Sequence, residues 1–275
     1  MIVFPNCKIN LGLNITGKRP DGYHNLETIF FPVKWYDILE IIRTEKTNNT
    51  ETFIASGIIA TANSNDNICL KAFTILKNDF PDRLPAVEFY LHKTIPTGSG
   101  LGGGSADAAF TLTLLNKHFQ LGLSTEQLIN YASRLGSDCP FFIINQPCFS
   151  SGRGEILEPV SLDLSTYKII LVNPQIHIAT NEAFARIVPA VPVKPVKEII
   201  QQPVTTWKEE LKNDFEIPVF EKYPEIGDIK KQLYECGAIY ASLSGSGSTV
   251  YGIFPNTEVM AFNFPPHYSC KESTG

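Results

Sequence analysis

The sequence lacks the features of a membrane or secreted protein. No apolar run approaches the roughly 20 residues that a membrane-spanning helix needs. The N-terminal segment MIVFPNCKIN has no basic region followed by an apolar stretch, so no secretory signal peptide is expected. The six cysteines are scattered without a CxxC pair, which favours reduced thiols over disulfide bridges or zinc ligands. We therefore expect a cytoplasmic protein with no membrane partner and no structural metal.

An excess of positive charge is also absent. The chain has 23 Lys and Arg against 28 Asp and Glu, a formal net charge of −5. This balance argues against a general affinity for nucleic acid or an anionic membrane. A small anionic substrate is still possible, because local cations and backbone amides can hold phosphates inside an acidic protein. The length of 275 residues, with 43% hydrophobic residues, suits one large globular domain or two ordinary ones.

Local patterns predict an α+β protein. Residues 7–16 alternate in polarity, which predicts a half-buried strand with Lys8 and Asn10 on its exposed face. A capping box, Ser124 to Gln127, marks the start of one helix. Further strands are expected at 26–33, 38–44, 87–92 and 167–172, and helices at 105–119, from 124 and at 224–236. Residues 139–145 are expected to begin a short helix or a buried run. We expect a loop at 189–203 and two lobes, residues 1–160 and 161–275, with no internal repeat.

The most informative segment is PTGSGLGGGSADAA, from Pro96 to Ala109. It has five glycines between positions 98 and 104, and each costs roughly 0.5–1 kcal/mol relative to alanine. Such a backbone lets another group approach closely, and the loop leads directly into the positive end of a helix. This pattern predicts a phosphate-binding loop. A flexible connector is the alternative, but a connector is rarely followed at once by an amphipathic helix.

Two common nucleotide-binding loops do not fit this segment. Gly98, Gly100 and Gly103 match GxGxxG, but a dinucleotide fold needs an acidic residue about 20 positions later, at the end of a second strand. Here that region is LGLSTEQL, the start of another helix. A Walker loop is excluded because no Lys-Ser/Thr pair follows the glycines. A third phosphate-binding architecture is needed.

Three segments together resemble the GHMP kinase superfamily: PNCKINLGLNI, PTGSGLGGGSADAA and SLSGSGSTVYGIF. Within it, TGKRPDGYH, NDNI, LGSDCPFFI, GRGEIL and NDFE are similar to the kinases of non-mevalonate isoprenoid biosynthesis. These kinases phosphorylate a hydroxyl of a cytidine diphosphate ester of methylerythritol. The resemblance spans nearly the whole chain. It implies an N-terminal lobe like a ribosomal protein S5 domain 2 and a ferredoxin-like C-terminal lobe.

The resemblance also implies where ATP and Mg²⁺ bind. ATP would lie over the glycine loop, with Asn67 beside the adenine and Mg²⁺ on the phosphates. Ser105 would bind a phosphate or Mg²⁺, although its hydroxyl is equally suited to cap the helix. Relatives often carry a second hydroxyl where this chain has Ala106, which leaves the metal ligands open. The implied ATP-binding residues are Asn67, Pro96, Gly98, Ser99, Gly100, Leu101, Gly102, Gly103, Gly104 and Ser105.

Two residues are implied in the chemistry. The resemblance makes Asp138 the base that takes the hydroxyl proton, whereas its local sequence, GSDCP, is equally suited to an N-cap. Lys8 would keep Asp138 ionised and balance the charge of the moving phosphoryl group. A lone strand lysine is more often a solvated edge charge.

The acceptor site is implied by further matches. Asn10 would contact the acceptor, Tyr23 and His24 would hold the cytosine, and Thr180 with Phe184 would close over the cytidine. The turn Gly245-Ser246-Gly247 would approach the glycine loop or the acceptor phosphates. A turn-flanking aromatic at Tyr23, a core role for Phe184 and a plain hairpin at residues 245–247 are the respective alternatives.

Other functions remain possible from the sequence. Another kinase of the superfamily, acting on homoserine, mevalonate or a sugar, would carry the same loop. A non-catalytic nucleotide sensor would be expected to lack Asp138 or Lys8, and both are present. We expect a monomer or a weak homodimer that binds a small-molecule cytidine diphosphate ester.

Overall fold

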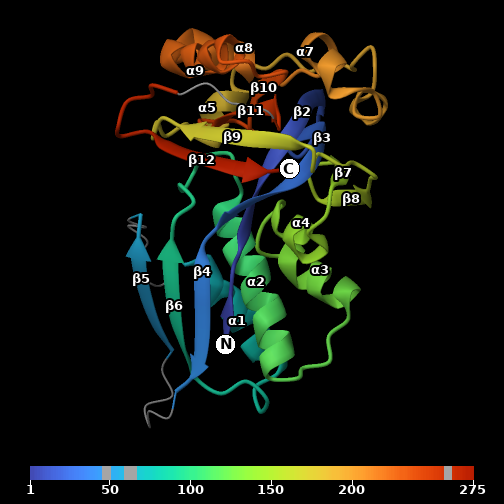
Figure 1. The fold of residues 1–275 in the computed structure, drawn as a ribbon. Helices are drawn as coiled ribbons and strands as arrows, with labels where there is room; N and C mark the ends of the chain where they lie inside the picture. The colour runs from blue at the N-terminus through green and yellow to red at the C-terminus, as the bar shows by residue number, and fades with distance from the viewer. Residues whose placement is uncertain (45–50, 59–66, 257–261) are drawn as a thin grey trace. The chain divides into compact units, whose positions relative to one another are not determined.

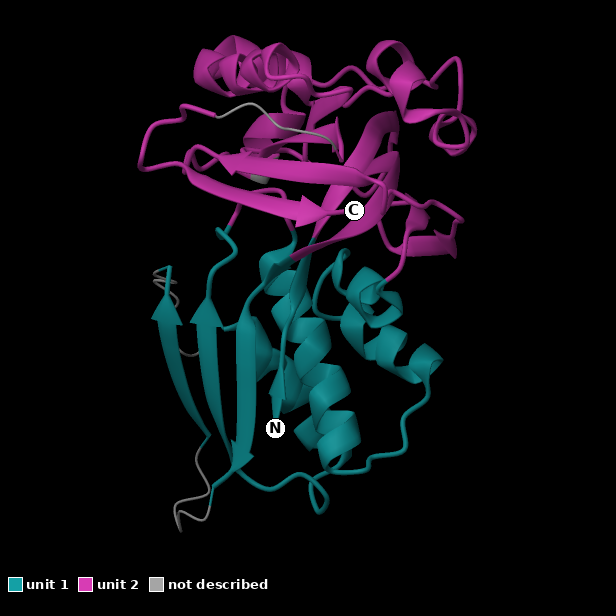
Figure 2. Ribbon diagram, viewed as in Figure 1, with its two compact units in different colours: residues 1–7, 35–97, 102–145 teal, residues 8–34, 98–101, 146–275 magenta. Residues whose placement is uncertain are grey.

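The computed structural model describes residues 1–44, 51–58, 67–256 and 262–275. These residues form two compact units that alternate along the chain (Figure 2). Unit 1 comprises residues 1–7, 35–97 and 102–145, and unit 2 comprises residues 8–34, 98–101 and 146–275. The predicted division near residue 160 follows sequence pattern alone and stays a prediction.

Unit 1 has a four-stranded sheet packed against helices (Figure 1). Its strand order is β1 (Ile2–Val3), β4 (Ile38–Arg43), β6 (Val87–Lys93) and β5 (Thr52–Gly57). Strands β5 and β6 are parallel, and the other pairs are antiparallel. Its helices are α1 (Ile68–Asp79), α2 (Gly103–His118), α3 (Thr125–Ser133) and α4 (Cys139–Ile144).

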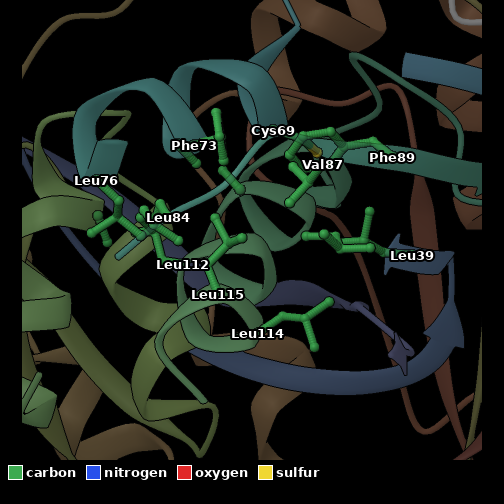
Figure 3. Packing of buried hydrophobic residues seen from close by; sticks show 14 of the residues in the cluster. Leu39, Cys69, Phe73, Leu76, Leu84, Val87, Phe89, Leu112, Leu114 and Leu115 are labelled. Carbon is green, nitrogen blue, oxygen red and sulfur yellow. The ribbon is translucent and has the colours of Figure 1, made fainter. Parts of the chain in front are cut away.

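The core of unit 1 lies between this sheet and the helices α1 and α2 (Figure 3). Alternation along β4 buries Leu39 and Ile41 and leaves Ile38 on the opposite, exposed face. Leu112 and Leu115 of α2 are buried in the same cluster, as their helical spacing predicts. This packing fixes the axis of α2, and therefore the direction in which its N-terminus points.

Two further four-stranded sheets lie in unit 2, except for the first two residues of β2 (Asn6–Lys18) and the last two of β3 (His24–Tyr36), which belong to unit 1. One has the order β2, β3, β7 (Cys148–Ser151) and β8 (Ile156–Pro159). The other is antiparallel, with the order β10 (Tyr240–Leu243), β11 (Val250–Pro255), β9 (Tyr167–Asn173) and β12 (Ser269–Thr274). The helices are α5 (Thr180–Phe184), α6 (Val196–Ile199), α7 (Trp207–Glu210), α8 (Glu216–Lys222) and α9 (Pro224–Glu235).

The expected elements recur with altered ends, and the capping box of Ser124 and Gln127 is confirmed. Two expectations are wrong. The strand over 7–16 is buried on both faces, because its polar side chains find partners inside the protein; Lys8 is only 3% exposed. The stretch 189–203 has little regular structure, as expected, but it does not lie wholly at the surface, because Val196 and Ile199 are buried in the four-residue helix α6. Among the described residues, no helix combines the length and apolar character that crossing a membrane requires.

Candidate active site

The first part of the glycine loop, residues 98–101, belongs to unit 2. Gly100 has φ +80°, and a Cβ there would lie 2.0 Å from the carbonyl oxygen of Ser244. Only glycine fits both the left-handed backbone and this close approach. The Ser99 carbonyl accepts a hydrogen bond from the Thr249 amide (3.1 Å), and the Leu101 carbonyl accepts one from the Lys8 amide (2.9 Å). The loop is therefore held in one conformation and does not behave as a flexible connector.

Lys8 and Asn10 lie together beside this part of the loop. The Lys8 ammonium donates to Asn10 Oδ1 (2.5 Å) and to the Gly100 carbonyl (2.9 Å), and it lies 5.0 Å from the centre of the Phe30 ring. Asn10 is 2% exposed and donates from Nδ2 to Thr28 Oγ1. A buried ammonium bonded to the loop is unlike a solvated edge lysine, so the alternative for Lys8 is not supported.

The turn at residues 245–247 is more than a hairpin. Ser244, which precedes it, is fully buried and donates from Oγ to the Gly100 carbonyl (2.9 Å). The Gly100 oxygen therefore accepts from both Lys8 and Ser244. Asn213 donates from Nδ2 to the carbonyls of Leu243 (2.8 Å) and Gly245 (2.9 Å), which holds the turn from its other side. The segment around Gly245-Ser246-Gly247 thus approaches the glycine loop, which was one of the two expected positions for this turn.

The second part of the loop, residues 102–105, belongs to unit 1 and opens α2. Gly102 is the N-cap, with φ +70° and no side-chain cap bond. A Cβ on Gly104 would meet no atom within 4 Å, so the first turn of the helix is open on that side. The unsatisfied amides and the dipole of a 16-residue helix make this an anion-binding position.

Ser105 occupies the third position of α2, so the alternative that it caps the helix is wrong. Its hydroxyl hydrogen-bonds the Cys139 thiol at the start of α4. Burial raises the pKa of that thiol to about 12, although the Ser105 bond acts in the opposite direction. Cys139 is therefore a neutral packing group that fixes Ser105 and α4 together.

Asp138 immediately precedes α4 and is half-buried. It stands at the N-cap position, but its side chain makes no capping hydrogen bond. Ser137 Oγ lies 3.4 Å from its Oδ1. The capping interpretation therefore does not account for this carboxylate. Lys8 belongs to unit 2 and Asp138 to unit 1, so their pairing stays a prediction.

Asn67 and Pro96 have structural positions in unit 1. Asn67 is the N-cap of α1, and its Oδ1 accepts from the Cys69 amide (2.8 Å). Its expected place beside adenine is a prediction that this cap does not exclude. Pro96 is buried at the start of the loop. The matching segment Asn65 to Ile68 begins outside the described residues.

The residues expected at the cytosine fall into two aromatic groups in unit 2. The His24 and Phe184 rings are stacked at 4.8 Å and 16°, and Phe184 meets Phe215 edge-on. Tyr23 is 58% exposed, and the Arg153 guanidinium lies 5.0 Å from its ring centre. Thr180 begins α5, the helix that carries Phe184. The structure thus brings His24 and Phe184 together and leaves Tyr23 with Arg153.

Metal-binding chemistry is sparse. Within the described ranges, no group of three or more His, Cys, Asp or Glu side chains could hold an ion. Mg²⁺ typically keeps several waters and takes its remaining ligands from one or two side chains and the substrate phosphates. The hydroxyl of Ser105, at the open terminus of α2, is an oxygen donor of the kind that Mg²⁺ takes.

Sequence reasoning missed several supporting residues. Ser244 and Asn213 act on backbone carbonyls across long sequence separations, which no local pattern reveals. Asn213 does lie in the quoted segment NDFE, which was the available signal. Lys93, Asp37 and Asp107 form a buried ionic cluster in unit 1. The helix α1 was also missed, although Asn67 is a favourable N-cap residue.

The geometry and the family comparison agree on the class of protein. The GHMP kinases N terminal domain matches residues 67–150, which include the glycine loop, α2 and Asp138. The GHMP kinases C terminal matches residues 196–261, which include Ser244 and the third motif. The chain belongs to the GHMP kinase family.

Three similar proteins carry the name of one kinase of this family. A protein of Bacteroides thetaiotaomicron named 4-diphosphocytidyl-2-C-methyl-D-erythritol kinase is 52% identical over 92% of both chains. One of the same name from Cytophaga hutchinsonii is 50% identical over 96% of this chain and 95% of its own. A crystal structure of 4-(cytidine 5'-diphospho)-2C-methyl-D-erythritol kinase superposes with a TM-score of 0.78 at 28% identity. It covers 92% of this chain and 90% of that chain.

Proposed function

We propose that this chain transfers the γ-phosphate of ATP to the 2-hydroxyl of 4-diphosphocytidyl-2-C-methyl-D-erythritol. The observation that carries the proposal is the open N-terminus of α2 after the glycine loop, in a chain half identical to relatives named for this reaction. Such an arrangement is built for a polyphosphate, and the relatives' name supplies the acceptor.

ATP phosphates would bind against the first turn of α2. The space beside Gly104 gives a phosphate oxygen access to helix amides, and the Ser105 hydroxyl adds a donor. Lys8 lies against the carbonyl of Gly100, so an ammonium stands at the loop itself. The adenine would lie near Asn67. Mg²⁺, arriving with ATP, would neutralise phosphate charge.

The chemical step would be a direct in-line transfer. The acceptor hydroxyl gives its proton to the Asp138 carboxylate as its oxygen bonds to the γ-phosphorus. The bond from that phosphorus to the bridging oxygen breaks, and ADP leaves with the electron pair. Lys8 offsets the negative charge on the moving group, and Asn10 orients both the ammonium and the acceptor.

The cytidine end would be held by the aromatic residues of unit 2. Two parallel rings with a base between them stand about 7 Å apart, twice a normal stacking distance. The His24 and Phe184 rings, at 4.8 Å, leave no such gap. Cytosine would therefore stack on an outer face of this pair or separate the two rings as α5 moves. Tyr23 and Thr180 would complete the contact.

An ADP-release assay with different acceptors tests the proposal. We expect turnover with 4-diphosphocytidyl-2-C-methyl-D-erythritol and none above background with mevalonate or homoserine. Turnover with either of the other two, and not with the cytidyl ester, would assign the chain to another GHMP kinase activity. ATP binding without turnover on any acceptor would favour a nucleotide sensor. A cytoplasmic location and a monomer or weak homodimer remain predictions from the sequence.

A further inference from the structure

A buried ionic triad lies at the base of the glycine loop in unit 1. Lys93, the last residue of β6, forms ion pairs with Asp37, between β3 and β4, and with Asp107 of α2 (2.7 Å to Oδ2). All three side chains are 3% exposed or less. One cation thus faces two carboxylates away from solvent. None of the three has a role in the chemistry proposed above.

The triad connects the two ends of the loop. Asp37 Oδ1 accepts from the amides of Thr94 (2.6 Å) and Ile95 (2.9 Å), the two residues just before Pro96. Asp107 lies on the first turns of α2, just after the last glycine. The strand-side and helix-side stems of the glycine loop also lie against each other. A Cβ placed on Gly103 would lie 2.9 Å from Ile95 and 3.5 Å from the Lys93 nitrogen.

The triad is costly for the folded protein. Removing three charges from water carries a large desolvation penalty, and such clusters often add no net stability. The second oxygen of Asp107, Oδ1, is buried, and no described residue donates to it. Burial raises the pKa of Asp107 to about 7; the Asp37 carboxylate adds to the rise and Lys93 opposes it. A cluster with these costs is retained most readily where it serves function.

We propose that the Asp37–Lys93–Asp107 triad is a positioning device for the ATP phosphates. It holds the two stems of the glycine loop at a fixed separation, so that the α2 terminus is preorganised for the triphosphate. The inference rests on the proposed kinase function for the identity of the anion. The two carboxylates hold the Lys93 ammonium by charge-assisted hydrogen bonds, which are roughly twice as strong as neutral ones.

The test is calorimetric binding of the non-hydrolysable analogue adenylyl-imidodiphosphate with Mg²⁺. Asp107→Asn keeps the shape and removes the charge, and we expect about tenfold weaker binding at pH 8, the equivalent of one lost charge-assisted bond.

Thr111→Val is the matched control. Thr111 is buried on α2 beside the triad; its hydroxyl donates to the Asp107 carbonyl (2.8 Å) and also hydrogen-bonds the Cys69 thiol. Thr111→Val therefore disturbs the same helix without changing charge. We expect its analogue affinity to stay within about twofold of wild type even if its melting temperature falls. Equal weakening in Thr111→Val and Asp107→Asn would show that the triad acts only through stability and would overturn the proposal. So would a dissociation constant for Asp107→Asn that lies within about twofold of the wild-type value.

A second variant keeps the proposal testable if Asp107→Asn does not fold. In Asp37→Asn the amide oxygen can still accept from Thr94 and Ile95, but one of the two charge-assisted contacts with Lys93 is lost. We expect about tenfold weaker analogue binding in this variant as well. Wild-type affinity in Asp37→Asn would contradict the inference. Analogue binding tests the role of the triad alone. A failure of the proposed function would instead show as absent phosphorylation of the cytidyl ester by the wild-type protein.

Discussion

At the residue scale, Lys8 and Asp138 differ in how firmly they are held. Lys8 is fixed by Asn10 and by the Gly100 carbonyl, whereas Asp138 is half-buried at the start of a short helix that it does not cap. A base must accept a proton and release it, so partial exposure suits Asp138. A charge partner must stay fixed during transfer, so burial suits Lys8.

Asp138→Asn should abolish proton transfer and leave nucleotide binding intact. We expect kcat to fall by about 10²–10⁴, the usual contribution of a general base, with analogue affinity within about twofold of wild type. Steady-state kinetics and calorimetry measure the two quantities. Asp82→Asn, a neutralised exposed carboxylate in the same unit, is the control and should behave as wild type. Full activity in Asp138→Asn would remove Asp138 from the mechanism.

Asp107 also has a consequence for stability. Its folded-state pKa is about 7, above its ordinary value of 3.8, so the folded chain holds an extra proton between roughly pH 4 and 7. The contribution of Asp107 to stability therefore falls as pH rises through this window. The melting temperature of Asp107→Asn, relative to wild type, should increase by roughly 5 °C between pH 5 and pH 8. A pH-independent difference would mean that Asp107 does not titrate there.

At the scale of elements, sequence periodicity predicted the strands and helices that bury one face. The helix after the glycine loop and the capped helix α3 were found in this way, with ends shifted by up to a few residues. Short elements such as β5 and α6 have too few residues for a period to show. The exposed face predicted for strand β2 was wrong, because polar residues that are buried and hydrogen-bonded cannot be told from solvent-facing ones by sequence alone.

The residues of the candidate site also fall into those that the sequence predicted and those that it did not. The loop, Lys8 and Asp138 were predicted because they lie in contiguous motifs. The residues that hold the loop, Ser244 and the triad, were not, because their partners are backbone atoms or charges far away in sequence. Only the folded chain shows that Gly100 must be glycine to pass the Ser244 carbonyl.

The two ends of the loop should respond differently to alanine. Gly104→Ala meets no atom within 4 Å and gains helix propensity, so its melting temperature should equal or exceed that of wild type. Its methyl group would occupy the space proposed for a phosphate, and we expect at least tenfold weaker analogue binding. Gly100→Ala should instead lower both the melting temperature and the affinity, because its Cβ clashes with backbone. Thermal melts with and without the analogue measure both effects; wild-type binding by Gly104→Ala would place the phosphates elsewhere.

At the scale of the whole molecule, the proposed function needs two sites: the open terminus of α2 for the ATP phosphates and the stacked pair His24 and Phe184 for the cytosine. The first lies in unit 1 and the second in unit 2. Acceptor choice is therefore expected to depend on unit 2 residues such as His24 and Phe184, and nucleotide binding on the loop.

The most direct measurement follows the phosphate itself. Wild-type protein, [γ-³²P]ATP and 4-diphosphocytidyl-2-C-methyl-D-erythritol are mixed in a single turnover, and the label is located after quenching. We expect one label in the cytidyl product for each ADP formed, none on the protein, and almost none transferred by Asp138→Asn in the same time. Label in inorganic phosphate or on the protein, with none in the cytidyl ester, would contradict direct transfer to this acceptor.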